Sequence, residues 1–141
     1  MKDYGKRFAS LRDARDYAGI MQSIPYARTV GMTFSENEHG DLLFHLPFYP
    51  HNIANTLLNA LFGGVIGGFL ENCALLQLMW VRESQTVPRT IDYLRSGRAQ
   101  SLYAQCELTK LGKRVAHVQV TSWQDDPAQP VAVARGHFLL L

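Results

Sequence analysis

The sequence predicts an α+β protein in which an antiparallel sheet of about six strands wraps around one long, apolar helix. Residues 60–82 are apolar over a length typical of a buried helix rather than of a strand. The second half of the chain alternates apolar and polar residues, as strands with one buried face do. Helix and strand patterns do not alternate along the chain, which argues against a doubly wound parallel sheet. The length of 141 residues fits one domain spanning 1–141.

The expected elements follow one another as a helix, two strands, a long helix and four strands. Their residues are 6–23, 28–38, 41–48, 60–82, 86–95, 101–111, 114–123 and 131–141. In the first helix apolar side chains recur at helical spacing and charged ones take the opposite face, until Pro25 ends it. A turn at His39-Gly40-Asp41 joins the first two strands, and a loop over 49–56 leads to the long helix.

The composition excludes several classes of protein. The net charge is +2, and no block of Lys and Arg is long enough for an extended nucleic-acid interface. Cys73 and Cys106 lie in apolar segments, so neither a disulfide framework nor a zinc site is expected. The five histidines are scattered without ligand spacing, so we assign no metal and no cofactor. The charged, amphipathic N-terminal segment is unlike a secretory signal, which makes the cytoplasm the expected location.

The long apolar segment raises the alternative of a membrane-spanning helix. Residues 57–81 are long enough to cross a bilayer, and they contain small-residue pairs of the kind that pack membrane helices. The segment also carries polar residues along its length, at Asn59, Glu71, Asn72 and Gln77. Because the flanking segments have strand periodicity, a helix covered by a sheet explains the pattern better, and no membrane contact is expected.

Four glycines and one carboxylate distinguish this helix from one that only fills a core. The glycines are at positions 63, 64, 67 and 68. Each costs about 1 kcal/mol relative to Ala in a helix, which indicates that something approaches the backbone closely. Glu71 is an ionisable group in apolar surroundings, which is costly unless the group is paired or used. The alternatives are that the glycines only allow tight packing of the helix on the sheet and that Glu71 is a structural, hydrogen-bonded acid. We interpret the segment as a binding and catalytic helix.

With these residues, the sequence resembles a hotdog-fold thioesterase of the phenylacetyl-CoA (PaaI) type over nearly the whole chain, from IPYARTVG at 24–31 onward. The family pattern is an Asn-containing loop, a His-Gly-Gly turn that opens the central helix, and an Asp or Glu nine residues after the His. Here Asn55 lies in the loop, the turn is Phe62-Gly63-Gly64, and Glu71 stands nine residues after Phe62. The segment TIDYLRSGR at 90–98 and the hairpin LGKRVAHVQV also match. Phe62 replaces the usual His.

The resemblance implies hydrolysis of an acyl-CoA thioester to a carboxylic acid and CoA. Backbone N–H groups at the helix N-terminus, left uncovered by Gly63 and Gly64, would polarise the thioester carbonyl. Glu71 would act as general base toward water or as a nucleophile that forms an acyl anhydride, and the sequence leaves both open.

The spacing of these groups also bears on oligomeric state. Eight residues of helix, roughly 12 Å, separate Gly63 from Glu71, which is too far for one helix to hold both groups on one thioester carbon. Two antiparallel helices from two subunits would bring Glu71 of one beside Gly63 of the other. This predicts a homodimer with two composite sites, as the resemblance also implies, and a homotetramer built as a dimer of dimers is a further alternative.

Other residues are expected to contact the acyl-CoA substrate. Asn55 would orient the thioester or the water, unless it is an ordinary turn residue. Thr86 or Thr90, on the strand that faces the helix, would position the water. Phe62 would line the acyl pocket, or belong to the core. The phosphates of CoA require basic groups. Four residues near strand ends offer them, with solvated surface charge as the alternative for each: Arg95, Arg98, Lys113 and Arg114.

A second hypothesis is a non-catalytic acyl-CoA-binding or sensing protein on the same fold. It follows from Phe62, which removes a polar side chain from beside the scissile carbonyl. A hotdog hydratase is less well supported, because it would need a His paired with the acid near the helix, and no suitable His follows.

Overall fold

The computed structural model describes residues 2–49, 53–55, 60–61, 63–81 and 84–140, with side chains for 6–49, 63–80 and 90–139. The helices are α1 (Lys2–Asp13), α2 (Tyr17–Ser23), α3 (Pro25–Val30) and α4 (Gly63–Val81). The strands are β1 (Thr33–Glu36), β2 (Leu42–Leu46), β3 (Ile53–Asn55), β4 (Ala60–Leu61), β5 (Ser84–Tyr93), β6 (Leu102–Leu111), β7 (Val115–Trp123) and β8 (Ala132–Leu140).

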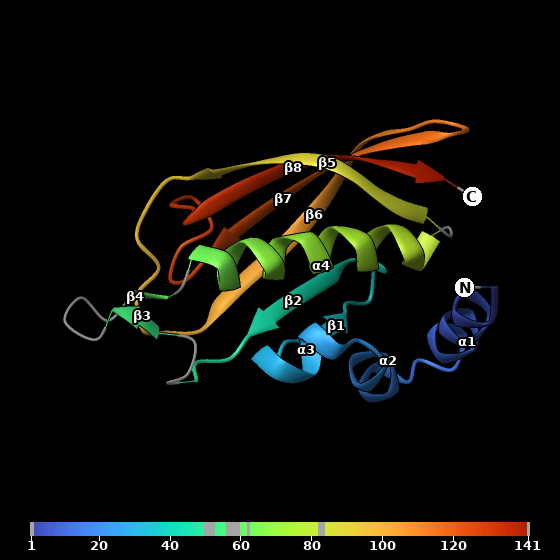
Figure 1. Ribbon diagram of the computed structural model, residues 1–141, viewed down its shortest axis with the longest axis horizontal. Helices are drawn as coiled ribbons and strands as arrows, with labels where there is room; N and C mark the ends of the chain where they lie inside the picture. Colours follow the sequence, from blue (N-terminus) through green and yellow to red (C-terminus); the bar gives the residue numbers. More distant parts are fainter. Residues whose placement is uncertain (1, 50–52, 56–59, 62, 82–83, 141) are drawn as a thin grey trace.

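Six of these strands form one antiparallel sheet in the order β1-β2-β6-β7-β8-β5, and β3 pairs with β4 in a separate small sheet. The long helix α4 runs along one face of the large sheet (Figure 1). This confirms the predicted fold class, and four strands follow α4 along the chain as expected.

The core lies between α4 and the sheet. Phe69 and Leu70 of α4 are fully buried, and so are the inward residues of the strands, such as Ala104, Val118 and Phe138. Burial of each large apolar side chain stabilises the fold by about 1.5–3 kcal/mol, so helix and sheet stabilise each other. In the described part of the chain, no helix has the combination of length and hydropathy needed to cross a membrane.

The N-terminal helix expected at 6–23 is two helices, so that prediction is wrong in its continuity. Arg15, between α1 and α2, has a left-handed backbone with φ of 55°. Asp16 then caps α2, since its side chain accepts a hydrogen bond from the backbone N–H of Gly19 at 2.9 Å. Both helices pack on the same core, so apolar residues keep their helical spacing across the break. The sequence pattern therefore did not reveal that the helix is interrupted.

The strand expected at 28–38 is also wrong in its first part, where the chain forms α3. Pro25 occupies the first turn, where its missing N–H costs nothing. Gly31 ends the helix with φ of 75°, and its N–H donates to the Ala27 carbonyl at 2.9 Å. The β-branched Thr29 and Val30 suggested a strand, but these two end signals decide the local structure. Only Thr33–Glu36 pairs in the sheet.

The segment before α4 contains more structure than the expected loop over 49–56. Ile53–Asn55 forms β3 and pairs with Ala60–Leu61. The helix therefore begins at Gly63, a few residues later than the predicted start at 60. This start places the first two glycines in the first helical turn.

Candidate active site at the N-terminus of helix α4

The first turn of α4 is open to approach from outside the chain. Gly63 and Gly64 are both exposed, and a Cβ atom at either position would meet no atom of the described residues within 4 Å. The first N–H groups of a helix have no partner within the helix, and they carry the positive end of its dipole. The turn can therefore receive a negatively polarised oxygen at close range.

A cavity of about 420 Å³ lies beside this turn. Its described lining residues are Gly63, Ile66, Tyr93, Leu94, Arg95, Ser96 and Gly97. Tyr93 connects its two sides, because its hydroxyl donates a hydrogen bond to the Gly63 carbonyl at 2.9 Å. The cavity thus combines a helix N-terminus, apolar surface and the guanidinium of Arg95.

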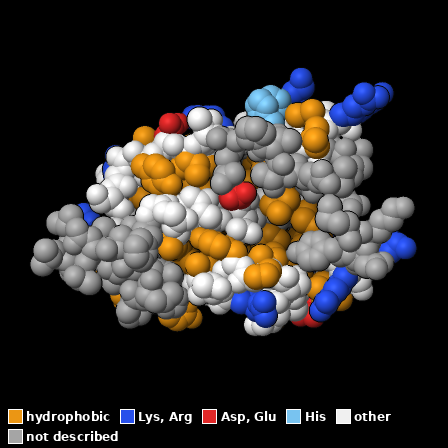
Figure 2. All heavy atoms as spheres, viewed as in Figure 1, with side chains coloured by type: hydrophobic (Ala, Val, Ile, Leu, Met, Phe, Trp, Pro, Cys, Tyr) orange, Lys and Arg blue, Asp and Glu red, His pale blue; other side chains and the backbone are white. Residues whose placement is uncertain are grey.

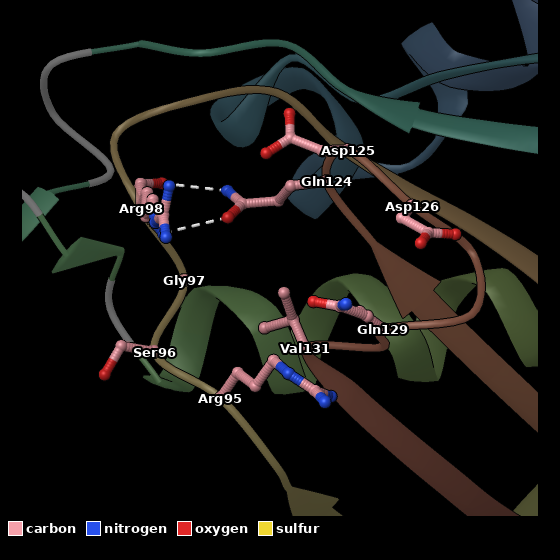
Figure 3. Close-up of a pocket in the computed structure, with 9 residues that line it drawn as sticks. All are labelled: Arg95, Ser96, Gly97, Arg98, Gln124, Asp125, Asp126, Gln129 and Val131. Carbon is pink, nitrogen blue, oxygen red and sulfur yellow. Dashed lines mark hydrogen bonds between the residues drawn. The ribbon is translucent and has the colours of Figure 1, made fainter.

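Arg95 also lines a second cavity of about 450 Å³, between the segment after β5 and the loop joining β7 to β8 (Figure 3). Gln124 ties the two segments together: its Oε1 accepts from the Arg98 N–H at 3.0 Å, and its Nε2 donates to the Arg98 carbonyl at 2.9 Å. The guanidinium of Arg95 donates to the Pro130 carbonyl at 2.8 Å. Asp125 and Asp126 line the same cavity, so its charge is mixed.

The other two glycines of α4 are covered by side chains of the same chain. A Cβ at Gly67 would lie 2.9 Å from the Tyr93 hydroxyl oxygen. A Cβ at Gly68 would lie 2.5 to 2.7 Å from three atoms of Tyr26. Tyr26, on α3, donates its hydroxyl hydrogen to the Val65 carbonyl at 2.7 Å. The close approach inferred for these two positions is therefore made by tyrosines.

Glu71 lies two turns further along α4 and is half-buried. It is the one acidic residue of that helix, and Figure 2 shows acidic atoms over α4 with hydrophobic atoms near them. The carboxylate is a neighbour of Tyr26. The pKa of Tyr26 is raised to about 12, mainly by burial and then by Cys73 and Glu71, with the backbone N–H of Phe69 acting in the opposite direction. Asn72 donates to the Gly68 carbonyl at 2.8 Å, which fixes its side chain against the helix.

The structure brings together only part of the predicted site within one chain. Gly63, Gly64, Arg95 and Arg98 lie at one end of the sheet. Lys113 and Arg114 lie in the β6–β7 hairpin at the opposite end of the sheet, the end toward which α4 runs (Figure 1). Thr90 pairs with Arg135 on the face of β5 turned away from α4, whereas its neighbour Ile91 faces Gly67.

Three predicted residues have side chains outside the described residues. Asn55 ends β3 and Thr86 lies in β5, and only their backbone placement is described. Phe62 lies wholly outside the described residues. Their proposed contacts with substrate therefore remain predictions.

Tyr26 and Tyr93 are the residues that the sequence analysis missed. Tyr93 stands in the TIDYLRSGR segment, two residues before Arg95, and its position there was the available signal. Tyr26 had no such signal, because its partner Gly68 is distant in the sequence. Among the side chains that the structure describes, no three His, Cys, Asp or Glu residues converge as metal ligands.

Comparison with known proteins identifies the family. The family profile described as acyl-CoA thioesterase N-terminal domain matches residues 54–139. The chain belongs to this acyl-CoA thioesterase family. The match spans α4 and strands β5 to β8, so it includes Gly63, Gly64 and Glu71.

Several solved structures resemble the chain over most of its length. A Chromobacterium violaceum protein is 51% identical, with 96% of this chain and 97% of that chain covered and a TM-score of 0.82. A Bacillus halodurans protein determined with CoA is 23% identical, with 96% and 92% covered and a TM-score of 0.72. A phenylacetic acid degradation-related protein from Ralstonia eutropha JMP134 is 20% identical, with 87% and 98% covered and a TM-score of 0.72. The two more distant structures show the hotdog fold alone. Among functionally curated proteins, no sequence matches this chain.

Proposed function

We propose that this thioesterase-family protein is a cytoplasmic acyl-CoA thioesterase of the PaaI type, which hydrolyses acyl-CoA to a carboxylic acid and CoA. The observation that carries the proposal is the open first turn of α4 at Gly63 and Gly64, beside a cavity that contains Arg95. The CoA bound to the Bacillus halodurans protein and the phenylacetic acid context of the Ralstonia eutropha protein support this substrate class.

In the proposed reaction the thioester oxygen accepts hydrogen bonds from the N–H groups of the first turn of α4. Glu71 takes a proton from water as the water attacks the carbonyl carbon, or its carboxylate attacks that carbon directly. Negative charge on the oxygen is stabilised by the N–H groups and the helix dipole. When the carbonyl re-forms, the C–S bond breaks, and the CoA thiolate takes up the proton that Glu71 removed from water. In the nucleophilic route this step gives CoA and an acyl anhydride on Glu71. Water then cleaves the anhydride, which releases the carboxylic acid, restores the Glu71 carboxylate and supplies the proton for CoA. Asn55 and Thr86 would orient the water or the thioester, whereas Thr90 lies on the face of β5 turned away from α4.

Two subunits would complete each site. The described surface supports this, because β5 is an edge strand whose pairing within the chain is with β8 alone. Antiparallel association along this edge would place Glu71 of one subunit near Gly63 of the other. Such an arrangement would also bring the Lys113 and Arg114 hairpin of one chain toward the opposite end of its partner, where CoA phosphates need cations. Further pairing of dimers into a tetramer is compatible with this geometry.

The direct test is thiol release from short, long and aromatic acyl-CoAs by the wild type, Glu71→Gln and the control Glu107→Gln. Glu107 is an exposed glutamate on β6, so its loss should leave turnover unchanged. Glu71→Gln should lower turnover by about a hundredfold or more with unchanged thermal unfolding. If the wild type binds acyl-CoA but releases no thiol, the protein is instead a binder or sensor, as Phe62 in place of His suggests.

The composite site has a separate test, in which two inactive variants are mixed. Glu71→Gln and Gly64→Val chains are unfolded together and refolded, so that dimers form at random. If Glu71 and Gly64 of one site come from different subunits, each mixed dimer regains one intact site, and activity returns to about a quarter of the wild-type value. If both residues of a site come from one chain, no activity returns and the composite arrangement is wrong.

A further inference from the structure

A third cavity, of about 350 Å³, lies between α2, α3 and the edge strand β1. Its floor is apolar and buried, and consists of Met21, Ala27, Met32 and Phe34. Its volume falls at the lower end of the range typical of small-molecule sites. None of its lining residues belongs to the cavities beside Gly63 and Arg95, so it is separate from the proposed thioesterase site.

The rim of this cavity is polar and carries a single charge among its described lining residues. Gln22, Arg28 and Thr33 are exposed there, and Arg28 is the charged one. In the described part of the chain, no carboxylate forms an ion pair with Arg28. A guanidinium that stands at the mouth of an apolar cavity without an acidic partner is complementary to a carboxylate on an apolar chain.

Glu36 is an acidic group on β1, a strand that lines the cavity, and it does not oppose such a ligand. Glu36 forms an ion pair with Arg15 at 2.9 Å, and it accepts a hydrogen bond from the Tyr17 hydroxyl at 3.3 Å. Its charge is therefore compensated inside the chain. The same hydrogen bond gives the Tyr17 hydroxyl a partner. Tyr17 lines the cavity, so its aromatic ring adds apolar surface to the lining.

The floor is also suited to flexible chains of differing length. Met21 and Met32 both reach it, and the unbranched, polarisable thioether adapts to irregular apolar shapes. We infer that the cavity between α2, α3 and β1 binds a free medium-chain monocarboxylate, with the alkyl chain on the methionine floor and the carboxylate at Arg28. This site is independent of the thioester-binding end of α4.

The test uses calorimetric titration of the full-length protein with hexanoate, octanoate and decanoate at neutral pH. Affinity should rise about fourfold for each added CH₂ until the cavity is filled. Octanol and octylammonium have the same chain without the negative charge, and both should bind more weakly than octanoate. Trp80 supplies an optical signal, because its ring lies 6.1 Å from that of Tyr17 and 5.4 Å from that of Phe34, and both of these residues line the cavity.

Variants separate the inferred site from other places where octanoate could bind. Arg28→Gln should weaken octanoate about tenfold and leave octanol unchanged. Ala18→Phe, at an exposed lining position, should block both ligands, whereas Arg114→Gln on the distant hairpin should block neither. Glu71→Gln protein should bind octanoate like the wild type, whether or not the chain proves to be a thioesterase. Absence of saturable binding in the low millimolar range, or equal octanoate affinity in the wild type and Arg28→Gln, would overturn the inference.

Discussion

The two glycine pairs of α4 differ in what surrounds them, although they lie one turn apart. Gly63 and Gly64 border open space, whereas Gly67 and Gly68 are in contact with tyrosines of the same chain. The first pair therefore leaves the helix N-terminus accessible to a substrate. The second pair admits Tyr26 and Tyr93, which attach α3 and β5 to the helix. The same pattern of paired glycines thus leaves the first turn of α4 open to a ligand and lets tyrosine side chains pack against the second turn.

Gly68→Ala should give the largest loss of stability among substitutions at these glycines. The new Cβ would lie 2.5 to 2.7 Å from ring and hydroxyl atoms of Tyr26, and Tyr26 is held by its hydrogen bond to Val65. Overpacking costs typically 1–3 kcal/mol, and the higher helix propensity of Ala offsets about 1 kcal/mol of this, so we expect a net loss of up to about 2 kcal/mol in urea unfolding.

Gly67→Ala is the matched control for that substitution. Its Cβ would meet only side-chain ends, Tyr93 Oη at 2.9 Å and Ile91 Cδ1 at 3.3 Å, and Tyr93 is half exposed and able to move. Its unfolding free energy should change by less than about 0.5 kcal/mol. If Gly68→Ala is as stable as the wild type, the contact of Tyr26 with the helix is not the reason for a glycine there.

Tyr26→Phe should have a smaller effect that depends on pH. Loss of the hydroxyl removes the hydrogen bond to Val65 and should cost about 0.5–1.5 kcal/mol near neutral pH. The pKa of Tyr26 is raised to about 12 from its ordinary value of 10.0, so folding favours the protonated form. The resulting stabilisation is complete below pH 10 and is lost as the pH rises from about 10 to 12.

The measurement is urea unfolding of both proteins from about pH 8 to the highest pH at which unfolding stays reversible. The stability difference between wild type and variant should be constant up to about pH 10 and should shrink above it. A difference that stays constant above that pH would show that Tyr26 ionises no less readily in the folded chain than in the unfolded one.

Gly64→Ala should have the smallest effect on stability, because its Cβ meets nothing within 4 Å in the part of the chain that the structure describes. Unfolding free energy should change by at most about 0.5 kcal/mol, in the stabilising direction. Turnover should nevertheless fall by roughly tenfold or more, since the methyl group covers the N–H groups proposed to hold the thioester oxygen. If the variant keeps full activity, the open space at Gly64 is not needed for catalysis.

The parts of the fold predictable from sequence are those with a strong local period. The alternation of Leu102, Ala104, Cys106 and Leu108 gives β6 its inward face, and the apolar segment gives α4. The helix α3 was not predictable from period, because Pro25 and Gly31 act only at its ends and its middle residues favour strands.

The candidate site was predictable only where one segment carries the whole signal. Gly63, Gly64 and Glu71 lie on a single helix with recognisable spacing, and Arg95 follows a recognisable strand. The contact of Tyr26 with Gly68 depends on how α3 packs on α4, which no local pattern encodes. The same holds for Gln124, whose two hydrogen bonds to Arg98 join segments far apart in the chain.

The order of the strands has a consequence for the kinetics of folding. Strands β6, β7 and β8 are consecutive and adjacent, so they can pair through short loops soon after collapse. The pairing of β2 with β6 brings Phe44 next to Ala104, and α4 lies in the stretch of chain between them. Strand β5 pairs with β8, and β6 and β7 lie between these two strands in the sequence. Such non-local pairings close late and slow the overall rate. We therefore expect the hairpins of β6, β7 and β8 to form before the pairings of β2 with β6 and of β5 with β8.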